Sequence, residues 1–319
     1  MGSAPVRRHG GAGPLDVRPL DAAHVTDVAG LLAEGTAFAP NVMARVLASR
    51  AASGTLPVLL GARDPQGGTI LGAALLDLHR PVAGGRLFAR VGVADGARAR
   101  GVARALVQCL AQLLPAGHAP LCAEVDGNDL RSQAVVRRWG GVEYQRSLSL
   151  ELDVAEAVRN PPRLPGAPAG VTVRSMRHDA DEQLWRAAFH VYATASLDLP
   201  DRAGAPAPSY DMFRAQIDHV PGLHLAWHDA VPVGLSGAGP DGPDAWYVFF
   251  TGTLPEWRRS GVARALKQAL HRTAHREGVR NLTTSTLSGN TPMLALNASL
   301  GYRTTGAIVR YEITELAVT

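Results

Sequence analysis

One hexapeptide occurs twice in this 319-residue chain, and this internal repeat restricts the folds open to it. The segment GVARAL at 101–106 returns unchanged at 261–266, an offset of 160 positions. An arginine stands three positions before the glycine of each copy, Arg98 and Arg258. An amphipathic run follows each copy and predicts a helix, ending near Leu114 and Glu277. Because the offset is the length of a whole domain, the sequence predicts two related domains in tandem.

Other landmarks recur in the same order. Val17-Arg18-Pro19-Leu20 and Val173-Arg174-Ser175-Met176 open the two halves, Gly-Asn occurs at 127–128 and 289–290, and Trp139-Gly140-Gly141 corresponds to Leu300-Gly301-Tyr302. Four prolines between 161 and 168 disfavour both helix and central strand and indicate a semi-rigid linker. The sequence therefore predicts a tail at 1–15, a first domain at 16–152, a linker at 153–169 and a second domain at 170–319.

The element pattern within each half predicts an α/β fold. Each half is expected to run strand, helix, one or two strands, a long strand, the repeated motif with its helix, then strand, helix and strand. The long strands are expected at 87–93 and 246–253, and earlier matching strands at 69–76 and 231–238. In the second half a helix is expected from Asp181 to about Ser196. This order favours a sheet with helices on both faces.

Composition limits the partners and the compartment. The net charge is +4, and no long basic run is present, so nucleic acid is not an expected partner. No stretch approaches the roughly 18 apolar residues that span a membrane. The two cysteines, Cys109 and Cys122, have no metal-ligand spacing, so no metal is expected and a reducing cytoplasm is the expected location. We expect a monomer or a homodimer.

The repeated motif has the properties of an anion site. A strand is followed after five positions by Arg-x-x-Gly-x-Ala at the start of a helix, in both halves. The first turn of a helix has unpaired backbone N–H groups and partial positive charge. Gly101 and Gly261 allow the backbone to approach a bulky phosphate, and Arg100 and Arg259 add charge. A pyrophosphate is therefore the expected ligand, although a solvated helix start is the alternative interpretation.

The sequence around both motifs resembles the GCN5-related N-acetyltransferase (GNAT) family. The segments that carry the resemblance are PEWRRSGVARAL at 255–266 and GNTPMLALNASLGY at 289–302, with similar stretches at 126–128 and 138–141. The resemblance implies two tandem GNAT-like domains, each a mixed, mostly antiparallel sheet flanked by helices. It also implies an N-acyltransferase that takes acetyl from acetyl-CoA, or another acyl group from its acyl-CoA, to a primary amine of a small molecule.

The resemblance assigns cofactor contacts position by position. The backbone of the strand before each motif is expected to pair with the pantetheine arm, at Thr251, Gly252 and Thr253 and at Val91, Gly92 and Val93. The turn amides are expected to hold pyrophosphate, at Arg258, Arg259, Ser260, Gly261, Val262 and Ala263 and at Arg98, Ala99, Arg100, Gly101, Val102 and Ala103. Further cofactor contacts are expected at Asn290 and Asn297.

The catalytic and acceptor residues are less clearly indicated. Many family members carry a tyrosine as general acid four residues before the glycine of Leu-Gly-Phe, but Asn297 and Val136 occupy those positions here. Tyr247, Glu256 and Asn297 remain catalytic candidates, each with the alternative of an ordinary surface or core residue. Tyr192, Asp198 and Tyr210 are the acceptor candidates, because they lie in the segment that roofs the acceptor site in the family. A solvated loop is the alternative for that segment.

We expect the second half to be catalytic, because it retains Trp257 in the motif and Leu-Gly-Tyr at 300–302. Two alternatives stay open. The missing tyrosine is also consistent with a non-catalytic acyl-CoA-binding or regulatory protein, and the donor is alternatively a longer acyl-CoA or a carrier-bound thioester.

Overall fold

The computed structural model describes residues 15–34, 40–65, 68–82, 85–162, 166–176, 180–197, 209–217 and 220–317. The chain divides into two compact units of similar size. Unit 1 comprises Met1–Gln145 together with Ile308–Thr319, and unit 2 comprises Arg146–Ala307. Each unit is described by itself below.

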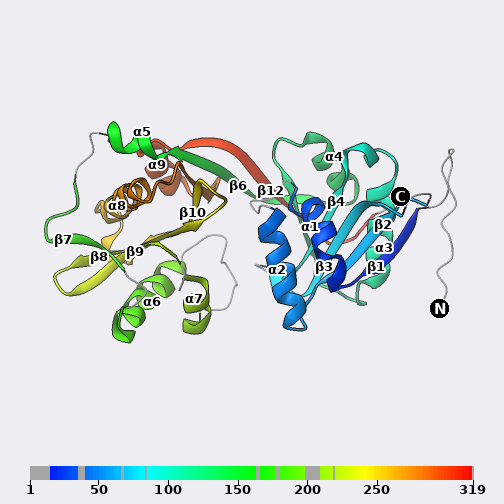
Figure 1. The fold of residues 1–319 in the computed structure, drawn as a ribbon, viewed down its shortest axis with the longest axis horizontal. Coiled ribbons are helices and arrows are strands. Elements are labelled where there is room, and N and C mark those ends of the chain that lie inside the picture. The colour runs from blue at the N-terminus through cyan, green and yellow to red at the C-terminus, as the bar shows by residue number, and fades with distance from the viewer. Residues whose placement is uncertain are drawn as a thin grey trace. The chain divides into compact units, whose positions relative to one another are not determined.

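In each repeat a first strand is followed by two helices and then by three strands that precede the motif helix (Figure 1). The strands are β1 (Asp16–Leu20), β2 (Val58–Arg63), β3 (Ile70–Val82), β4 (Arg86–Val93), β5 (Leu121–Asp126), β6 (Val142–Asp153), β7 (Val171–Ser175), β8 (Gly222–His228), β9 (Val231–Pro240), β10 (Ala245–Thr253), β11 (Asn281–Leu287) and β12 (Arg303–Ile313). The helices are α1 (Val25–Ala33), α2 (Pro40–Ala52), α3 (Val102–Leu113), α4 (Leu130–Arg138), α5 (Val154–Arg159), α6 (Glu182–Ser196), α7 (Tyr210–Ile217), α8 (Val262–Arg276) and α9 (Thr291–Ser299). Short 3-10 turns precede the motif helices, η3 (Asp95–Ala97) and η5 (Pro255–Trp257).

The two units share one sheet topology. In unit 1, strands β1 to β4 pair antiparallel in sequence order, β4 pairs parallel with β5, and β5 pairs antiparallel with β12. In unit 2, strands β7 to β10 pair antiparallel in order, β10 pairs parallel with β11, and β11 pairs antiparallel with β6. The predicted fold class, a mixed and mostly antiparallel sheet in each of two repeats, is confirmed.

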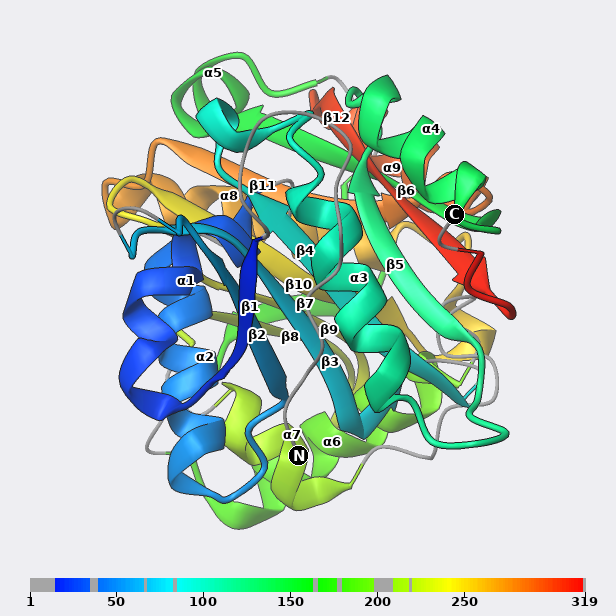
Figure 2. The same cartoon turned by 90° about the vertical axis from the view of Figure 1, so that its right-hand side faces the viewer.

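Helices cover both faces of each sheet. In unit 1, α1 and α2 pack with Leu59, Ala73 and Leu75, whereas α3 packs with the alternate residues of the same strands (Figure 2). Since successive side chains of a strand point to opposite faces, these two clusters lie on opposite faces. In unit 2, α6 and α7 pack with Leu223, Leu225 and Leu235, and α8 packs with Ala226 and with Val233, which lies at an irregularity in the register of β8 and β9.

The last strand of each repeat belongs to the unit formed by the other repeat. In unit 1, β12 from the end of the chain pairs with β5, from Ile308↔Asp126 to Ile313↔Leu121. In unit 2, β6 from the end of the first repeat pairs with β11, from Asn281↔Asp153 to Leu287↔Ser147. Sequence patterns place each strand with its own repeat, because a local pattern shows that a segment is a strand and not which neighbour it pairs with.

In each sheet one glycine leaves space for the helix of the repeated motif to pack closely on a strand. An added Cβ at Gly72 would lie 2.7 Å from Val102 and 3.2 Å from Leu106. An added Cβ at Gly234 would lie 2.9 Å from both Val262 and Leu266. The same contact therefore occurs in both units, and it fixes the first turn of α3 on β3 and of α8 on β9.

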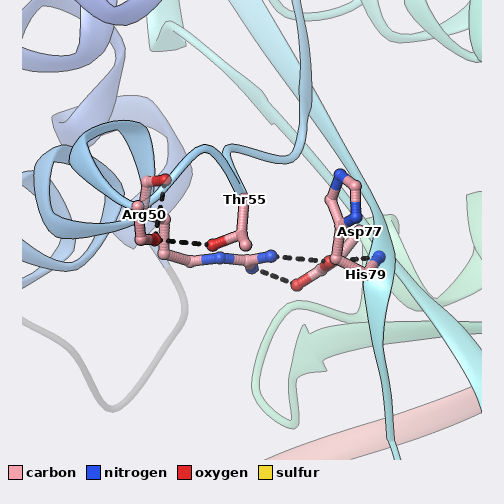
Figure 3. A network of polar contacts seen from close by, with 5 residues as sticks. Arg50, Thr55, Asp77 and His79 are labelled. Carbon is pink, nitrogen blue, oxygen red and sulfur yellow. Dashed lines mark hydrogen bonds and ion pairs between the residues drawn. The ribbon is translucent and has the colours of Figure 1, made fainter.

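A buried ion pair joins α2 to β3 in unit 1. Arg50 donates two hydrogen bonds to the Asp77 carboxylate, whose Oδ1 also accepts the backbone N–H of His79 (Figure 3). The side chains of Arg50 and Asp77 are only 10% and 9% exposed. Breaking such a pair leaves a buried charge, so the pair ties α2 firmly to the sheet.

The range predicted as linker contains a helix. Helix α5 occupies part of 153–169, its Val154 is completely buried, and its first backbone N–H donates to the carbonyl of Arg280. The Asp153 side chain accepts the N–H of Glu156 and caps the helix. The Pro-rich stretch begins after this helix, at Pro161.

Candidate active site

Strands β10 and β11 separate after three paired positions, and the gap between them is the candidate site. Their parallel pairing runs from Ala245↔Asn281 to Tyr247↔Thr283. A pocket opens past this point, lined by residues of β10, β11, α8 and α9. Its members are Val248, Phe249, Phe250, Thr251, Lys267, Thr284, Ser285, Thr286, Leu287, Asn290, Met293 and Asn297.

A β-bulge in β10 begins where the strands separate. Val248 pairs with Ala238 and Phe250 pairs with Gly237, so Phe249 is the extra residue. An added Cβ at Gly237 would lie 2.4 Å from the Phe249 ring, so that glycine provides the space for the bulged side chain. A bulge bends its strand and ends regular pairing, which accounts for the departure of β10 from β11.

Hydroxyl groups hold the walls of the pocket in place. Thr284 donates to the carbonyl of Val248 at 2.9 Å, which bridges the two strands at the base of the gap. The carbonyl of Phe250 accepts from the hydroxyls of Ser236 and Thr251 at 3.3 and 2.9 Å. These bonds fix the backbone of β10 next to the pocket.

Two buried polar side chains, Lys267 and Asn297, also line this pocket. Asn297 is fully buried, its Nδ2 donates to Thr286 at 3.3 Å, and its Oδ1 has no hydrogen-bond partner. Lys267 is 1% exposed, and its Nζ lies 4.8 Å from the ring centroid of Tyr302. Burial lowers the pKa of Lys267 to about 7. A polar atom that is buried without a partner is a group that a ligand can satisfy.

Sequence reasoning missed Lys267, although the repeat contained a signal. The matching position in the first half is Val107, and Val136 matches Asn297. Both valines are buried in unit 1. At these two positions the first repeat therefore has a buried valine and the second repeat has a polar residue.

The predicted phosphate turn has the same backbone form in both units. Ala99 and Gly101 have φ of 63° and 81°, and Arg259 and Gly261 have φ of 60° and 98°. Each glycine is the N-cap of its helix, α3 or α8. The first amides of a helix have no intrahelical acceptor, so both turns present N–H donors with the helix dipole behind them.

The corresponding gap of unit 1 is crossed by an ion pair. Strands β4 and β5 also pair at three positions only, ending at Ala89↔Ala123. The next residues, Arg90 and Glu124, lie 3.5 Å apart, and Glu124 also accepts from Arg310 at 2.8 Å. Desolvation lowers the pKa of Arg90, although the Glu124 charge partly offsets this effect.

Strand β4 also lacks the bulge. Its register with β3 is unbroken from Asp77↔Phe88 to Gly72↔Val93. An added Cβ at Gly92 would lie 2.0 Å from the carbonyl oxygen of Leu31, because α1 packs its main chain directly on β4. In unit 2 an added Cβ at the matching Gly252 would instead lie 2.6 Å from the Phe250 ring and 2.8 Å from the side chain of Ala195.

The arginine of the first turn has protein partners. Arg98 forms ion pairs with Glu34 and Asp95 and donates to the carbonyl of Val93. The hydrogen bond to Glu34 raises the pKa of Arg98. This arginine therefore ties the turn to the end of α1.

The catalytic candidates do not converge. Asn297 lies in the pocket, whereas Glu256 is exposed in η5 and Tyr247 is the last paired residue of β10. Asn290 lines the pocket and caps α9 by accepting the N–H of Met293. Thr251 lines the pocket, and Gly252 and Thr253 continue the same strand toward the turn.

Two of the three acceptor candidates lie in one aromatic cluster. Tyr192 on α6 lies 4.8 Å from Phe250 and 5.0 Å from Phe213, between ring centroids. Tyr210 on α7 donates to Glu182 at 3.0 Å. Asp198 lies outside the described residues. The cluster packs against Phe250, so it adjoins the β10 wall of the pocket.

No group of three or more His, Cys, Asp or Glu side chains in the part of the chain that the structure describes is placed to hold a metal ion. Within the same part, no helix is long and apolar enough to cross a membrane.

The doubled sheet, with a bulged strand, a gap and a glycine turn at a helix start, defines a tandem acetyltransferase-like fold. A solved GCN5-related N-acetyltransferase from Sphaerobacter thermophilus has a TM-score of 0.68 at 18% identity, over 93% of this chain and 95% of that one. A tandem GNAT protein from the clavulanic acid biosynthesis pathway also has a TM-score of 0.68, at 21% identity, over 93% and 98%. These likenesses show the fold.

Sequence comparisons give the family. The model of the acetyltransferase (GNAT) family matches residues 184–302. A mycothiol acetyltransferase of Geodermatophilus obscurus is 31% identical over 66% of this chain and 68% of its own length. A mycothiol acetyltransferase of Catenulispora acidiphila is 27% identical over 78% and 79%. The chain belongs to the GNAT family and is an N-acetyltransferase, as the sequence predicted.

Proposed function

We propose that unit 2 carries the transfer of an acetyl group from acetyl-CoA to a primary amine of a small molecule. The observation that carries the proposal is the bulge at Phe249 with the gap beside it, which is open in unit 2 and crossed by Arg90 and Glu124 in unit 1. In unit 2 the bridge at the base of the gap is the Thr284 hydroxyl on the Val248 carbonyl, and the pocket past it offers room for the thin pantetheine arm between two strands.

The residues of unit 2 fit the donor from end to end. The turn at 258–263 offers backbone N–H groups to the pyrophosphate. The edge of β10 from Thr251 to Thr253 offers main-chain groups that the amides of the pantetheine arm pair with, in the manner of an added strand. The amide oxygen of Asn297 gains a donor when the arm enters the pocket.

The chemistry that this chain supplies is positioning and charge stabilisation. Fixing both reactants in one geometry replaces a bimolecular encounter by a unimolecular step. Hydroxyl groups of Ser236, Thr251 and Thr284 hold the carbonyls of the backbone around the bulge, and main-chain N–H groups of this segment are the proposed donors to the negative charge that develops on the carbonyl oxygen.

The aromatic cluster suggests where the acceptor amine binds, and the names of the relatives suggest which compound to test. Tyr192 and Tyr210 form one side of the proposed acceptor site, and the Glu182 carboxylate beside Tyr210 is already paired with Arg186 and Arg214. The two relatives described above are named for mycothiol, so their acceptor is the first compound to test.

Titration calorimetry and an assay of acetyl-CoA consumption test this proposal. Wild-type protein is expected to bind acetyl-CoA and to consume it when an acceptor from an amine panel is added. Absence of binding would overturn the donor assignment. Binding without turnover on any amine would favour the non-catalytic alternative, and faster turnover of a longer acyl-CoA would change the donor.

A further inference from the structure

Lys267 is the only lysine in a chain with 32 lysine and arginine residues. It is also 1% exposed, although lysine is almost never fully buried unless its charge is paired. Arginine does not lose its proton in proteins, whereas lysine titrates readily when it is buried. The one lysine side chain, which can lose its proton when it is buried, therefore lies in the wall of the candidate active site.

Lys267 lies on the side of the site proposed for the acyl donor, and not on the side proposed for the acceptor amine. The pocket that it lines is formed by β10, β11, α8 and α9, and neither α6 nor α7 contributes a described residue to it. Tyr192 and Tyr210, the proposed acceptor residues, belong to α6 and α7. Lys267 thus lies on the side where the thioester sulfur enters.

Among the described residues, no carboxylate forms an ion pair with Lys267. Its Nζ faces the ring of Tyr302, and His271 lies one turn further along α8, 3.3 Å from the Tyr302 hydroxyl. The pKa of His271 is lowered to about 3 by burial, with a further contribution from Lys267, so His271 is neutral near pH 7. The uncharged hydroxyls of Thr284 and Thr286 and the amide of Asn297 complete the polar wall.

A cation in this position stabilises a negative charge that forms in the pocket. We propose that Lys267 is the catalytic acid of unit 2, giving a proton from Nζ to the coenzyme A sulfur as it leaves. This inference rests on the proposed function of the pocket.

Every atom and charge of the acetyl transfer is accounted for. The acceptor nitrogen forms a bond to the acetyl carbon, the carbon–sulfur bond breaks, and the sulfur takes the bonding pair together with the proton of Lys267. The proton of the acceptor amine passes to water, and a proton from water restores the ammonium group. A Lys267 pKa of about 7 lies below that of an ordinary thiol, about 8.5, so the transfer to a thiolate is favourable.

The single lysine allows a direct test in wild-type protein. With 13C-labelled lysine the chain has one labelled side chain, and its NMR shift gives the pKa of Lys267 without a substitution. The apparent pKa is expected to shift when coenzyme A binds, because the lysine amine and the sulfur then exchange a proton and titrate as a coupled pair. Desulfo-coenzyme A, which lacks the sulfur, is expected to leave it unchanged. Equal shifts with both ligands would overturn the proposal.

A second measurement follows the sulfur. The ultraviolet absorbance of the thiolate, taken as the difference between coenzyme A and desulfo-coenzyme A complexes, gives the pKa of the bound thiol. Lys267→Met is expected to raise that pKa by about one unit and to lower kcat by about 10²-fold or more with KM nearly unchanged. Arg272→Met removes an exposed cation of α8 outside the pocket and is expected to change neither value.

The outcomes separate this inference from the proposed function. If wild-type protein binds no coenzyme A, the function proposed for the pocket fails. If it binds coenzyme A but Lys267→Met keeps the wild-type thiol pKa and kcat, only the role of Lys267 fails. If Lys267→Met does not fold, the NMR titration of the wild-type lysine decides alone.

Discussion

The guanidinium of Arg90 lies 3.5 Å from the carboxylate of Glu124 across the gap where β4 and β5 stop pairing. Val248 and Thr284 follow the last paired residues of β10 and β11 in unit 2, and there the threonine hydroxyl bonds to the valine carbonyl. The two repeats thus differ at this point. An ion pair crosses one gap, and in the other a threonine hydroxyl bonds to the main chain beside a pocket.

Removal of Glu124 is expected to destabilise unit 1 without affecting the pocket of unit 2. Glu124→Ala leaves Arg90, whose side chain is 6% exposed, without its nearest carboxylate. Loss of one partner of a buried ion pair costs about 3–5 kcal/mol. Urea unfolding and hydrogen exchange of β4 and β5 measure the loss. Glu143→Ala, which removes a more exposed carboxylate 3.8 Å from Arg137, is the control with a small expected effect. A Glu124→Ala protein as stable as wild type would show that Arg90 finds another partner.

The two glycine turns provide a matched pair for cofactor binding. Gly261→Glu places a carboxylate and a β-carbon at a φ of 98°, at the N-terminus of α8. Repulsion of the pyrophosphate and strain of the turn are expected to weaken acetyl-CoA binding by at least about tenfold. Gly101→Glu makes the same change at the start of α3 and is expected to leave the affinity of unit 2 unchanged. Calorimetry on both variants measures the affinities, and the opposite ranking would assign donor binding to unit 1.

Unit 2 is expected to lose stability as the pH falls from about 6.5 toward 4. Burial, with smaller contributions from the charges of Arg276 and Arg272, lowers the pKa of His224 from 6.5 to about 4. Because the unfolded chain binds a proton in this range and the folded chain does not, stability rises with pH here and falls on acidification. His271, with a pKa lowered to about 3, acts in the same direction.

Urea titrations followed by tryptophan fluorescence measure this pH dependence, since Trp185, Trp227, Trp246 and Trp257 all belong to unit 2. His224→Gln retains a side-chain donor for Thr273 and removes one titrating group, so its stability is expected to change less between pH 7 and pH 4.5. An unchanged slope would show that His224 is not neutral in the folded state.

Tyr311, near the end of the chain, is expected to stabilise the unit formed by the first repeat. Its ring is completely buried in the core of unit 1, and its hydroxyl donates to Gln133 at 3.1 Å. Tyr311→Ala is expected to cost about 3–5 kcal/mol and Tyr311→Phe about 1 kcal/mol. Hydrogen exchange of β5, residues 121–126, reports the effect. Faster exchange confined to β11 in Tyr311→Ala would contradict the pairing of β12 with β5.

Much of the fold followed from local patterns. The repeated hexapeptide, the β-rich runs before it and the glycine at each helix start predicted strands β4 and β10 and helices α3 and α8 to within a residue or two. Gly101 and Gly261 suit the left-handed N-caps, whereas the left-handed conformations of Ala99 and Arg259 were not indicated by the sequence. The contrast of Trp257 and Leu-Gly-Tyr with their counterparts favoured the second repeat, and the cofactor assignments at 251–253 and 258–263 remain predictions.

The sequence by itself determined that the chain has two copies of one α/β module, each with a motif that suits a phosphate. Local propensity, periodicity and a repeated motif are properties of neighbouring residues. Only the tertiary structure decided which strand completes each sheet, where β10 bulges, and which gap is closed by an ion pair. Those features depend on pairs such as Arg90 with Glu124 or β12 with β5, whose members are distant in sequence and meet only when the core forms. Both the sequence and the tertiary structure bear on Lys267. The repeat shows that a lysine stands where the first half has Val107, and the fold places that lysine in the pocket.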